Sequence, residues 1–285
     1  MSKDRELEDI YKVVPWPEDP WSEEGRSRYE EGLKRFKRLI SHEWIGSLAS
    51  KRNCLRILDV CGGTGIGGVA LAKALMESGK NVELTITDLR KSALRTAVKF
   101  GKEIGIKVMV RQVDALKIHE MGEKHDVAIL YGNSSPHFNP WRMVRLIASV
   151  SDSISEDGVF ILDEVDRIYM FLVQGYRFVL PDEASKKRAV ISIHSNYDPI
   201  TGEIRRLEFD LVKRKRVELP LYFWGITELM SIAWLFFKDI DFLRDEEGRR
   251  GQCRGLILAY GPRRRINPND FAYLPKALAG CEGFK

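Results

Sequence analysis

The chain has 285 residues, enough for one large domain or two small ones, and its 44% hydrophobic content is that of an ordinary globular protein. Its net charge of +5, from 46 basic and 41 acidic residues, is too modest to indicate a nucleic-acid-binding protein by itself. The longest apolar stretch, residues 221–237, contains Glu228 and is shorter than the ~20 residues that span a bilayer. We therefore expect no membrane partner.

Cysteine usage and the first residues indicate the cellular compartment. The four cysteines are widely scattered and no C-x-x-C pair occurs, so we expect reduced thiols and no metal site. The chain begins with charged residues rather than a signal peptide, which predicts a cytoplasmic protein. A charged fraction of 31% with only three glutamines is typical of a thermophilic source.

Residues 1–51 precede the first predicted strand. Residues 11–21 are rich in proline and aromatic side chains, which favours an extended segment packed on a surface. Ser22 is followed by two glutamates, an N-cap signal, and we expect a helix that continues, with breaks, through Trp44.

A glycine-rich turn follows the first strand at residues 57–68, which read I-L-D-V-C-G-G-T-G-I-G-G. An apolar run that ends in an acid and is followed by glycines and a helical pattern is typical of a nucleotide-binding turn. Gly63, Gly65 and Gly68 satisfy G-x-G-x-x-G, so a dinucleotide is one candidate. However, Asp59 under this turn would repel the pyrophosphate of NAD and would favour a cationic group.

This turn resembles the first motif, roughly L-D-V-G/A-C-G-T-G, of class I methyltransferases that depend on S-adenosylmethionine (SAM). SAM carries an ammonium group and no phosphate. Cys61 and Gly62 stand where the family usually has a small residue and then Cys; both are small, so we expect the loop to be retained. The resemblance implies that Asp59 and Gly63 hold the methionine end of SAM. A turn that binds nothing is the structural alternative. The predicted cofactor residues here are Asp59, Cys61, Gly62, Gly63 and Gly65.

Acids also end the second and third predicted strands, residues 82–88 and 108–115. A single strand-end Asp is more often a turn former or helix cap, but three in order would line the ligand-binding edge of a parallel sheet. An acid after the second strand suits the ribose hydroxyls of SAM or NAD equally. The resemblance implies that the third acid lies near the adenine. The predicted cofactor residues here are Asp88, Leu89, Asp114 and Ala115.

The loop after the fourth predicted strand reads Y-G-N-S-S-P-H over residues 131–137. It resembles the G-N-S-x-x-H segment of glycine and sarcosine N-methyltransferases and related small-molecule enzymes, and it lacks the D/N-P-P-Y/F motif of enzymes that methylate nucleobases. The resemblance places Tyr131 and Gly132 beside the cofactor. Asn133 would orient a substrate and His137 would take a proton. A surface or capping role for His137 is an equally favoured alternative.

The fifth predicted strand, residues 159–164, ends at Glu164, which we expect to face the methyl group together with Asn133 and His137. In glycine N-methyltransferases an arginine just past the acid of this strand holds the substrate carboxylate. If Asp163 is that acid, Val165 occupies the arginine position and Arg167 is displaced by two residues, which argues against glycine as the acceptor.

The resemblance also implies a role for the N-terminal segment, which in related enzymes closes over the cofactor and supplies an arginine to its carboxylate. Arg26 and Arg28 lie in the matching segment, and we assign Arg28. Two exposed helix charges are the alternative.

Residues 167–222 read as an inserted antiparallel flap, with strands at 189–194 and 204–212 joined by a turn at 198–202. A helix at 226–237 and a hairpin then complete a seven-stranded Rossmann-like α/β sheet, whereas a NAD-dependent dehydrogenase would continue with βα units. The predicted divisions are a lid (1–51), a SAM-binding core (52–166), the flap (167–222), core completion (223–262) and a tail (263–285).

These observations predict an enzyme that transfers a methyl group from SAM to a small-molecule amine or hydroxyl and releases S-adenosylhomocysteine (SAH). An RNA or protein methyltransferase that docks through the basic clusters at 213–216 and 263–265 is an alternative, although solvated surface explains these clusters more simply. A non-catalytic SAM-binding protein is a further alternative, and a NAD-dependent enzyme is the least favoured. The sequence does not specify an oligomeric state.

Overall fold

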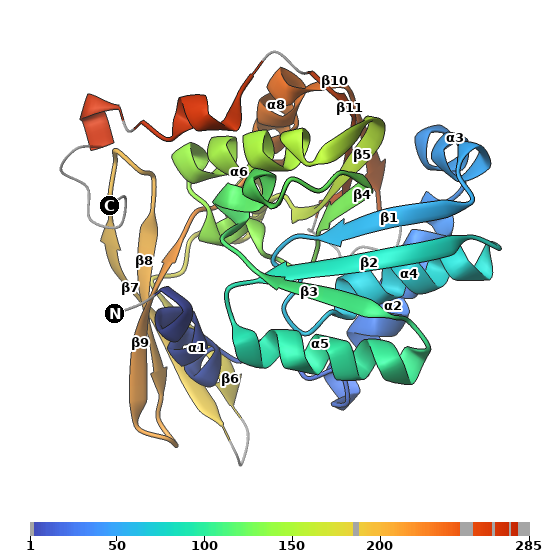
Figure 1. Ribbon diagram of the computed structural model, residues 1–285. Helices are drawn as coiled ribbons and strands as arrows, with labels where there is room; N and C mark the ends of the chain where they lie inside the picture. The colour runs from blue at the N-terminus through green and yellow to red at the C-terminus, as the bar shows by residue number, and fades with distance from the viewer. Residues whose placement is uncertain (1–2, 185–187, 246–252, 264–265, 274, 279–285) are drawn as a thin grey trace.

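The computed structural model describes residues 3–184, 188–245, 253–263, 266–273 and 275–278. Its centre is a seven-stranded sheet in the order β10-β11-β5-β4-β1-β2-β3 (Figure 1). The strands are β1 (Cys54–Asp59), β2 (Asn81–Asp88), β3 (Val108–Gln112), β4 (His125–Leu130), β5 (Ile154–Val165), β10 (Phe237–Arg244) and β11 (Arg254–Pro262). Strands β1 to β5 pair in parallel, and β11 is antiparallel to both β5 and β10. The predicted fold class, including the terminal antiparallel hairpin, is confirmed.

Helices cover both faces of this sheet and form two apolar cores with it. One face carries α2 (Glu23–Leu39), α3 (Glu43–Lys51), α4 (Ile66–Glu77) and α5 (Lys91–Ile104), and the other carries α6 (Pro140–Asp152), α8 (Ile226–Phe236) and the 3-10 helix η1 (Ala115–Met121). Short 3-10 helices lie at η2 (Ser135–His137), η3 (Pro268–Phe271) and η4 (Lys276–Leu278). Because both faces are covered, the central strands are continuous apolar runs rather than alternating ones.

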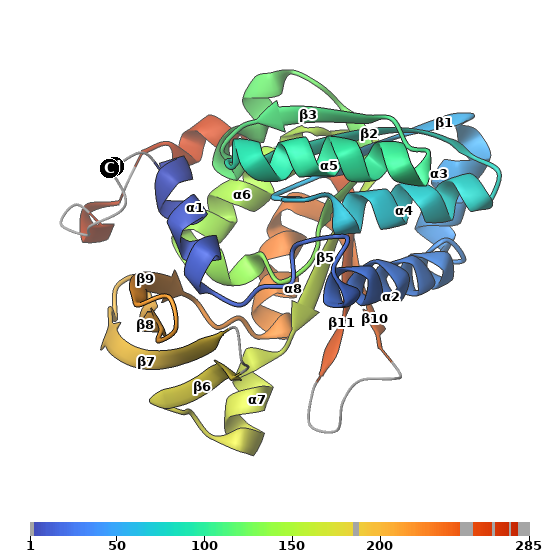
Figure 2. The same cartoon turned by 90° about the horizontal axis from the view of Figure 1, so that it is seen from below.

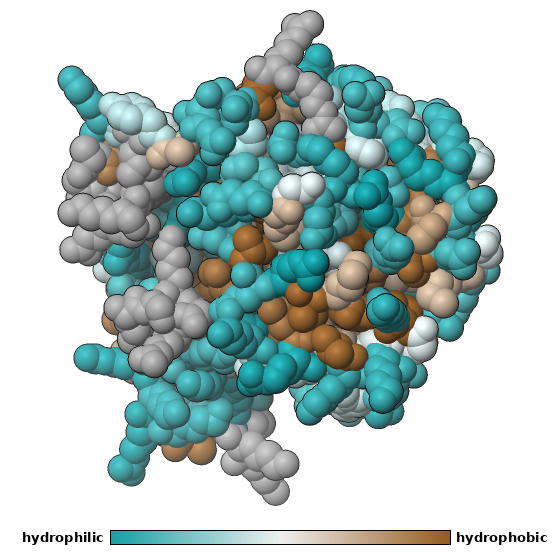
Figure 3. All heavy atoms as spheres, viewed as in Figure 1, coloured by the Kyte–Doolittle hydropathy of each residue, from teal (hydrophilic) through white to brown (hydrophobic). Residues whose placement is uncertain are grey.

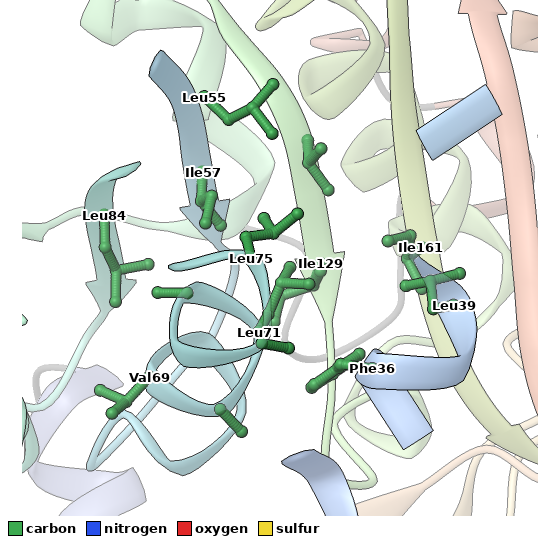
Figure 4. Close-up of a cluster of buried hydrophobic side chains, with 14 of the residues drawn as sticks. Phe36, Leu39, Leu55, Ile57, Val69, Leu71, Leu75, Leu84, Ile129 and Ile161 are labelled. Atoms are coloured by element: carbon green, nitrogen blue, oxygen red, sulfur yellow. The ribbon is translucent and has the colours of Figure 1, made fainter. Parts of the chain in front are cut away.

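The core beneath the glycine loop fixes the strand ends that concern the site. Figure 4 shows Ile57, Leu84, Ile129 and Ile161, from four neighbouring strands, packed against side chains of α2 and α4. Each of these four side chains is at most 1% exposed. The carboxyl ends of β1, β2, β4 and β5 are therefore held rigidly at one edge of the sheet.

The N-terminal segment differs from the expectation of an extended chain over residues 11–21. A helix, α1 (Lys3–Val13), covers the first part of that stretch, and the extended chain begins only after Val13. This helix packs against β8 (Ile204–Asp210) and β9 (Lys215–Leu221) of the flap and buries Ile10 and Val13 (Figure 2). The expected start of the next helix is confirmed, because Ser22 caps α2 by accepting a hydrogen bond from the backbone N–H of Gly25.

The predicted flap contains a separate four-stranded antiparallel sheet in the order β6-β7-β8-β9. Its strands are β6 (Val179–Ala184), β7 (Ala189–Tyr197), β8 (Ile204–Asp210) and β9 (Lys215–Leu221), and helix α7 (Arg167–Gln174) precedes them. The predicted hairpin corresponds to β7 and β8, and at its turn the N–H of Gly202 donates to the carbonyl of Asp198. We did not predict β6, β9 or α7.

Hydrophilic side chains cover most of the face seen in Figure 3, and apolar atoms show mainly near its centre. Within the described ranges, no helix is long and apolar enough to cross a membrane. Of the basic clusters, 213–216 includes the turn that joins β8 and β9, whereas residues 264–265 lie outside the described residues. The guanidinium of Arg263 donates to backbone carbonyls at the end of α8, including that of Trp234.

Candidate active site

The glycine loop after β1 is shaped around the side chain of Asp59. Gly63 and Gly65 have positive φ angles of 54° and 86°, which favour glycine. A Cβ atom on Gly62 or Gly68 would lie only 2.4 or 2.6 Å from Asp59 Oδ2. The loop therefore needs glycine at two further positions so that the carboxylate can lie beneath it.

Asp59 is 1% exposed, and among the described residues only one of its oxygens has a partner. Oδ2 accepts a hydrogen bond of 2.8 Å from the N–H of Gly68, while Oδ1 has no partner among the described residues. Burial raises the pKa of Asp59 to about 7. A buried carboxylate oxygen without a partner suits a ligand ammonium, whose positive charge would lower that pKa again.

Asp88, at the end of β2, organises the other side of the loop. Its Oδ2 accepts from the N–H of Gly63 at 3.0 Å, and its Oδ1 accepts from the N–H of Arg90 at 2.8 Å. Burial raises the pKa of Asp88. Since both oxygens already accept backbone hydrogen bonds, a ribose would have to share them.

Arg90 is a site residue that the sequence analysis missed. Its Nη1 lies 2.7 Å from Glu18 Oε2, and its guanidinium lies 3.6 Å from the ring centroid of Tyr11. The hydroxyl of Thr64 in the glycine loop donates to the carbonyl of Glu18 at 2.6 Å. The N-terminal segment is thus attached to the ends of both β1 and β2.

A cavity of about 420 Å³ lies along this sheet edge. It brings together predicted residues from four loops: Cys61, Asp88, Leu89, Asp114, Ala115 and His137. Asp114 follows β3 rather than belonging to it, and it caps η1 by accepting from the N–H of Leu116 at 3.0 Å. Cys61 has a φ angle of 55°, so a residue other than glycine occupies the left-handed region here.

A small cavity of about 30 Å³ lies at the glycine loop itself. Its lining includes the predicted residues Arg28, Asp59, Cys61, Gly62, Gly63, Tyr131 and Gly132. Gly65 lines none of the three cavities described in this section; it is the N-cap of α4, and a Cβ there would lie 3.0 Å from Ala97. Gly65 therefore allows close packing beneath the loop and does not line a cavity.

Arg28 reaches this small cavity from α2. Its Nη1 donates to the carbonyl of Pro17 at 2.6 Å, and its guanidinium lies 4.6 Å from the ring of Trp16. A Cβ on Gly132 would come within 2.7 Å of the guanidinium. Burial lowers the pKa of Arg28. The Arg28 guanidinium is thus held against the loop that follows β4.

A larger cavity, of about 770 Å³, lies where that loop meets α1, α7 and the flap sheet. Asn133 and His137, two of the residues expected to face the methyl group, both line it. Asn133 has a φ angle of 69°, and its Oδ1 accepts a hydrogen bond from Arg167. Burial and, next, the charge of Arg90 lower the pKa of His137 to about 4. The imidazole is therefore neutral at neutral pH and a weak base.

Glu164 differs from the expectation that it faces the methyl group. It is 1% exposed, pairs with Arg167 and does not line the large cavity, whereas Arg167 does. Arg167 lies two residues after the arginine position of glycine N-methyltransferases, but its guanidinium still lines the cavity. Glu164 already balances the charge of that guanidinium. The neighbouring Asp163 lines the cavity and pairs with Arg35 at 2.8 Å and Arg254 at 3.2 Å.

Tyr11, which the sequence analysis did not single out, lines all three cavities, and His137 lines the two larger ones. Burial raises the pKa of the Tyr11 hydroxyl to about 12. These two side chains therefore mark the place where the cavity along the sheet edge meets the larger one. Within the parts of the chain that the structure describes, no group of three His, Cys, Asp or Glu side chains is arranged to hold a metal ion.

Comparison with known proteins agrees with this geometry. Residues 57–158, from the glycine loop to β5, match the family model described as a methyltransferase domain. This stretch therefore resembles a methyltransferase domain. The prediction of a methyltransferase enzyme that uses SAM is therefore confirmed. The finer resemblance to glycine and sarcosine N-methyltransferases stays a prediction.

Solved structures share the fold of this methyltransferase. PH0226 protein from Pyrococcus horikoshii is 22% identical, with a TM-score of 0.58 over 89% of this chain and 98% of that one. An S-adenosylmethionine-dependent methyltransferase from Clostridium acetobutylicum is 15% identical, with a TM-score of 0.57 over 80% and 91%. The sugar N-methyltransferase KedS8 from Streptoalloteichus is also 15% identical, with a TM-score of 0.55 over 84% and 91%. No curated protein matches the chain.

Proposed function

We propose that this methyltransferase acts on a small-molecule amine or hydroxyl acceptor that is enclosed between the core, the N-terminal segment and the flap. The observation that carries the proposal is the junction at Tyr11 and His137, where the 420 Å³ cavity along the sheet edge meets the 770 Å³ cavity. In this proposal the lid (1–51) and the flap (167–222) close over a core made of 52–166 and 223–262.

The proposed cofactor site runs along the ends of β1, β2 and β3. Asp59 would hold the ammonium of the methionine end, and Arg28 would hold its carboxylate through a bidentate contact. Asp88 would accept from the ribose hydroxyls, with Asp114 near the adenine. The remaining proposed contacts are Cys61, Gly62, Gly63, Leu89, Ala115, Tyr131 and Gly132, with Gly65 supporting the loop.

When bound, SAM supplies a methyl group already activated by its sulfonium. The chain's own residues then have to align the acceptor for in-line displacement and keep water away. Asn133 and His137 would orient the acceptor, and neutral His137 can accept a hydrogen bond from its N–H or O–H group. Arg167 fixes the Asn133 amide, and Glu164 acts through Arg167 rather than on the acceptor.

Two observations favour a small acceptor larger than glycine. The cavity of about 770 Å³ lies in the upper part of the range of small-molecule sites. The structural relatives include proteins described as a sugar N-methyltransferase and an amino pentose methyltransferase. An amine on such a scaffold needs no strong base at the transfer step, which agrees with the lowered pKa of His137.

The proposal is tested by incubating the full chain with SAM labelled in its methyl group and with separate panels of amines, amino sugars, phenols, RNA and protein. We expect label in a small amine and a one-to-one yield of SAH. Label in RNA or protein alone, with binding that weakens steeply as salt increases, would support the docking alternative instead. SAM binding without turnover on any panel would favour a non-catalytic role.

A further inference from the structure

The inner face of the flap sheet carries charged side chains where a strand normally buries apolar ones. Alternate residues of β8 point to the same side of a sheet, and Arg206, Glu208 and Asp210 are all at most 5% exposed. Arg206 and Glu208 line the 770 Å³ cavity, as does Ser192 of the neighbouring β7. Burial of charge is costly unless it is paired, so this face is better suited to a polar ligand than to an apolar core.

The guanidinium of Arg206 donates its hydrogen bonds to neutral groups. Its Nε donates to the Ser192 hydroxyl at 2.6 Å and its Nη2 to the Ser192 carbonyl at 3.0 Å. Its Nη1 donates to the Tyr176 hydroxyl at 3.0 Å and to the carbonyl of Arg177 at 3.2 Å. Among the described residues, no carboxylate lies within ion-pair distance of this guanidinium.

One carboxylate oxygen of Glu208 is consequently available to accept a hydrogen bond from a ligand. Its Oε1 accepts from the Ser192 hydroxyl at 2.5 Å, while its Oε2 is buried and has no partner within the described ranges. A second carboxylate, Asp182, lines the same cavity from β6 and makes no ion pair there with a described residue. Burial raises the pKa of Glu208, and the charge of Asp182 adds to that effect.

Aromatic rings lie beside these carboxylates in the same cavity. Phe171 contacts Tyr176 and Phe223 with ring centroids 5.5 and 4.7 Å apart, and all three side chains line the cavity. Aromatic faces attract cations, as carboxylates do. Two carboxylates and three rings therefore face a cavity in which the Arg206 guanidinium already has its hydrogen-bond acceptors, and Arg177 also lines that cavity.

We propose that the flap end of the large cavity is a binding site for an organic cation, a protonated amine that the acceptor carries away from the atom to be methylated. This inference rests on the proposed function, because it extends the acceptor from the junction at His137 to the flap. Glu208 would accept from the ammonium through Oε2, and Asp182 would add negative charge. The same arrangement would disfavour a phosphate group at this end.

The test is calorimetric titration of the full chain, with and without SAH, using two matched probe pairs: tryptamine with indole-3-propionate, and glucosamine with glucose. We expect each amine to bind at least about tenfold more tightly than its partner, since hydrogen bonds to charged groups are strong. We expect Glu208→Gln to abolish that preference. Glu183→Gln is the matched control, because Glu183 lies on the same sheet, pairs with Arg188 at 3.7 Å and does not line the cavity.

Equal affinity within each pair, or binding of no amine, in the wild-type protein would overturn the inference even if Glu208→Gln failed to fold. A preference that both variants reduce equally would overturn it as well, because net charge alone would then explain it. Failure of SAH to bind would contradict the proposed function, whereas the preference for amines is still measured without SAH. The two failures are therefore distinguishable.

Discussion

At the scale of single residues, burial controls the ionisation of the side chains nearest the proposed reaction. It raises the pKa of Asp59 to about 7 and lowers that of His137 to about 4. Both shifts favour the neutral form because a charge loses hydration in a buried site. The two residues nevertheless have different expected roles, since a cationic ligand would restore the charge of Asp59, whereas the arginines near His137 keep it neutral.

The affinity for SAM should therefore rise with pH between about pH 6 and 7.5, below the pKa of the ligand's own amino group. A protonated Asp59 has to lose its proton before it can pair with the ammonium, so binding to the protonated form releases a proton. Calorimetry in buffers of different ionisation enthalpy measures that release. Asp59→Asn should lower the affinity about ten- to hundredfold and remove its pH dependence. A pH-independent wild-type affinity would contradict the role of Asp59.

His137 should act as a neutral hydrogen-bond acceptor. We expect His137→Ala to lower kcat/KM about tenfold or more, with partial recovery in His137→Gln, and we expect no inflection from this histidine between about pH 6 and 9. Steady-state kinetics over that range measure both effects. Full turnover in the alanine variant at every pH would show that the histidine has no part in catalysis.

At the scale of elements, two connections position the site. The first attaches the N-terminal segment to the sheet edge through Glu18, which contacts Arg90 and Thr64. The second attaches the start of α8 to the loop that carries His137, because Trp224 Nε1 donates to the carbonyls of Ser135 at 3.2 Å and Phe138 at 2.9 Å.

Loosening the first connection should shorten the residence of the cofactor. Glu18→Gln removes the ion pair with Arg90 but keeps the backbone contact to Thr64, so we expect SAM to dissociate about three- to tenfold faster. Stopped-flow measurement of SAM release tests this. Glu24→Gln, at an exposed position on α2, is the control, and equal rates in the two variants would mean that the ion pair does not retain the cofactor.

Loosening the second connection should lower stability. Trp224 is 1% exposed, and Trp224→Phe would remove the indole donor from the carbonyls of Ser135 and Phe138. The Ser135 carbonyl keeps the N–H of Phe138 as a donor, whereas the Phe138 carbonyl loses its partner, at a cost of about 1–3 kcal/mol in the free energy of unfolding. Trp234→Phe is the matched control, since Trp234 is 59% exposed and should change that free energy by no more than about 0.5 kcal/mol. Urea titration followed by circular dichroism gives both values. Equal stability of the two variants would refute the role assigned to the indole N–H.

At the scale of the whole molecule, the sequence predicted what depends on local pattern. The apolar runs, the glycines of the loop and the strand-end acids Asp59 and Asp88 are local signals, and they define the sheet and its ligand-binding edge. Helix α1 was missed because its apolar residues, Ile10 and Val13, pack against the distant β8 and β9. The contact of Arg90 with Glu18 joins residues 72 positions apart, which no local pattern reveals.

The flap was also predicted only where its local sequence pattern is strong. Its turn chemistry predicted the hairpin of β7 and β8, but β6 and β9 have weaker signals, and β6 carries Pro181 as an edge strand can. The placement of Glu164 also required the structure, because only the fold decides which of two adjacent acids faces the cavity. Asp163 does so, while Glu164 pairs with Arg167.

The most direct test of the account is calorimetric titration of the full chain with SAM, SAH and NAD in parallel. The charge and shape of the glycine loop predict micromolar binding of the two adenosyl ligands and no binding of NAD. Binding of NAD alone would contradict both the role given to Asp59 and the assignment of the cavities to cofactor and acceptor.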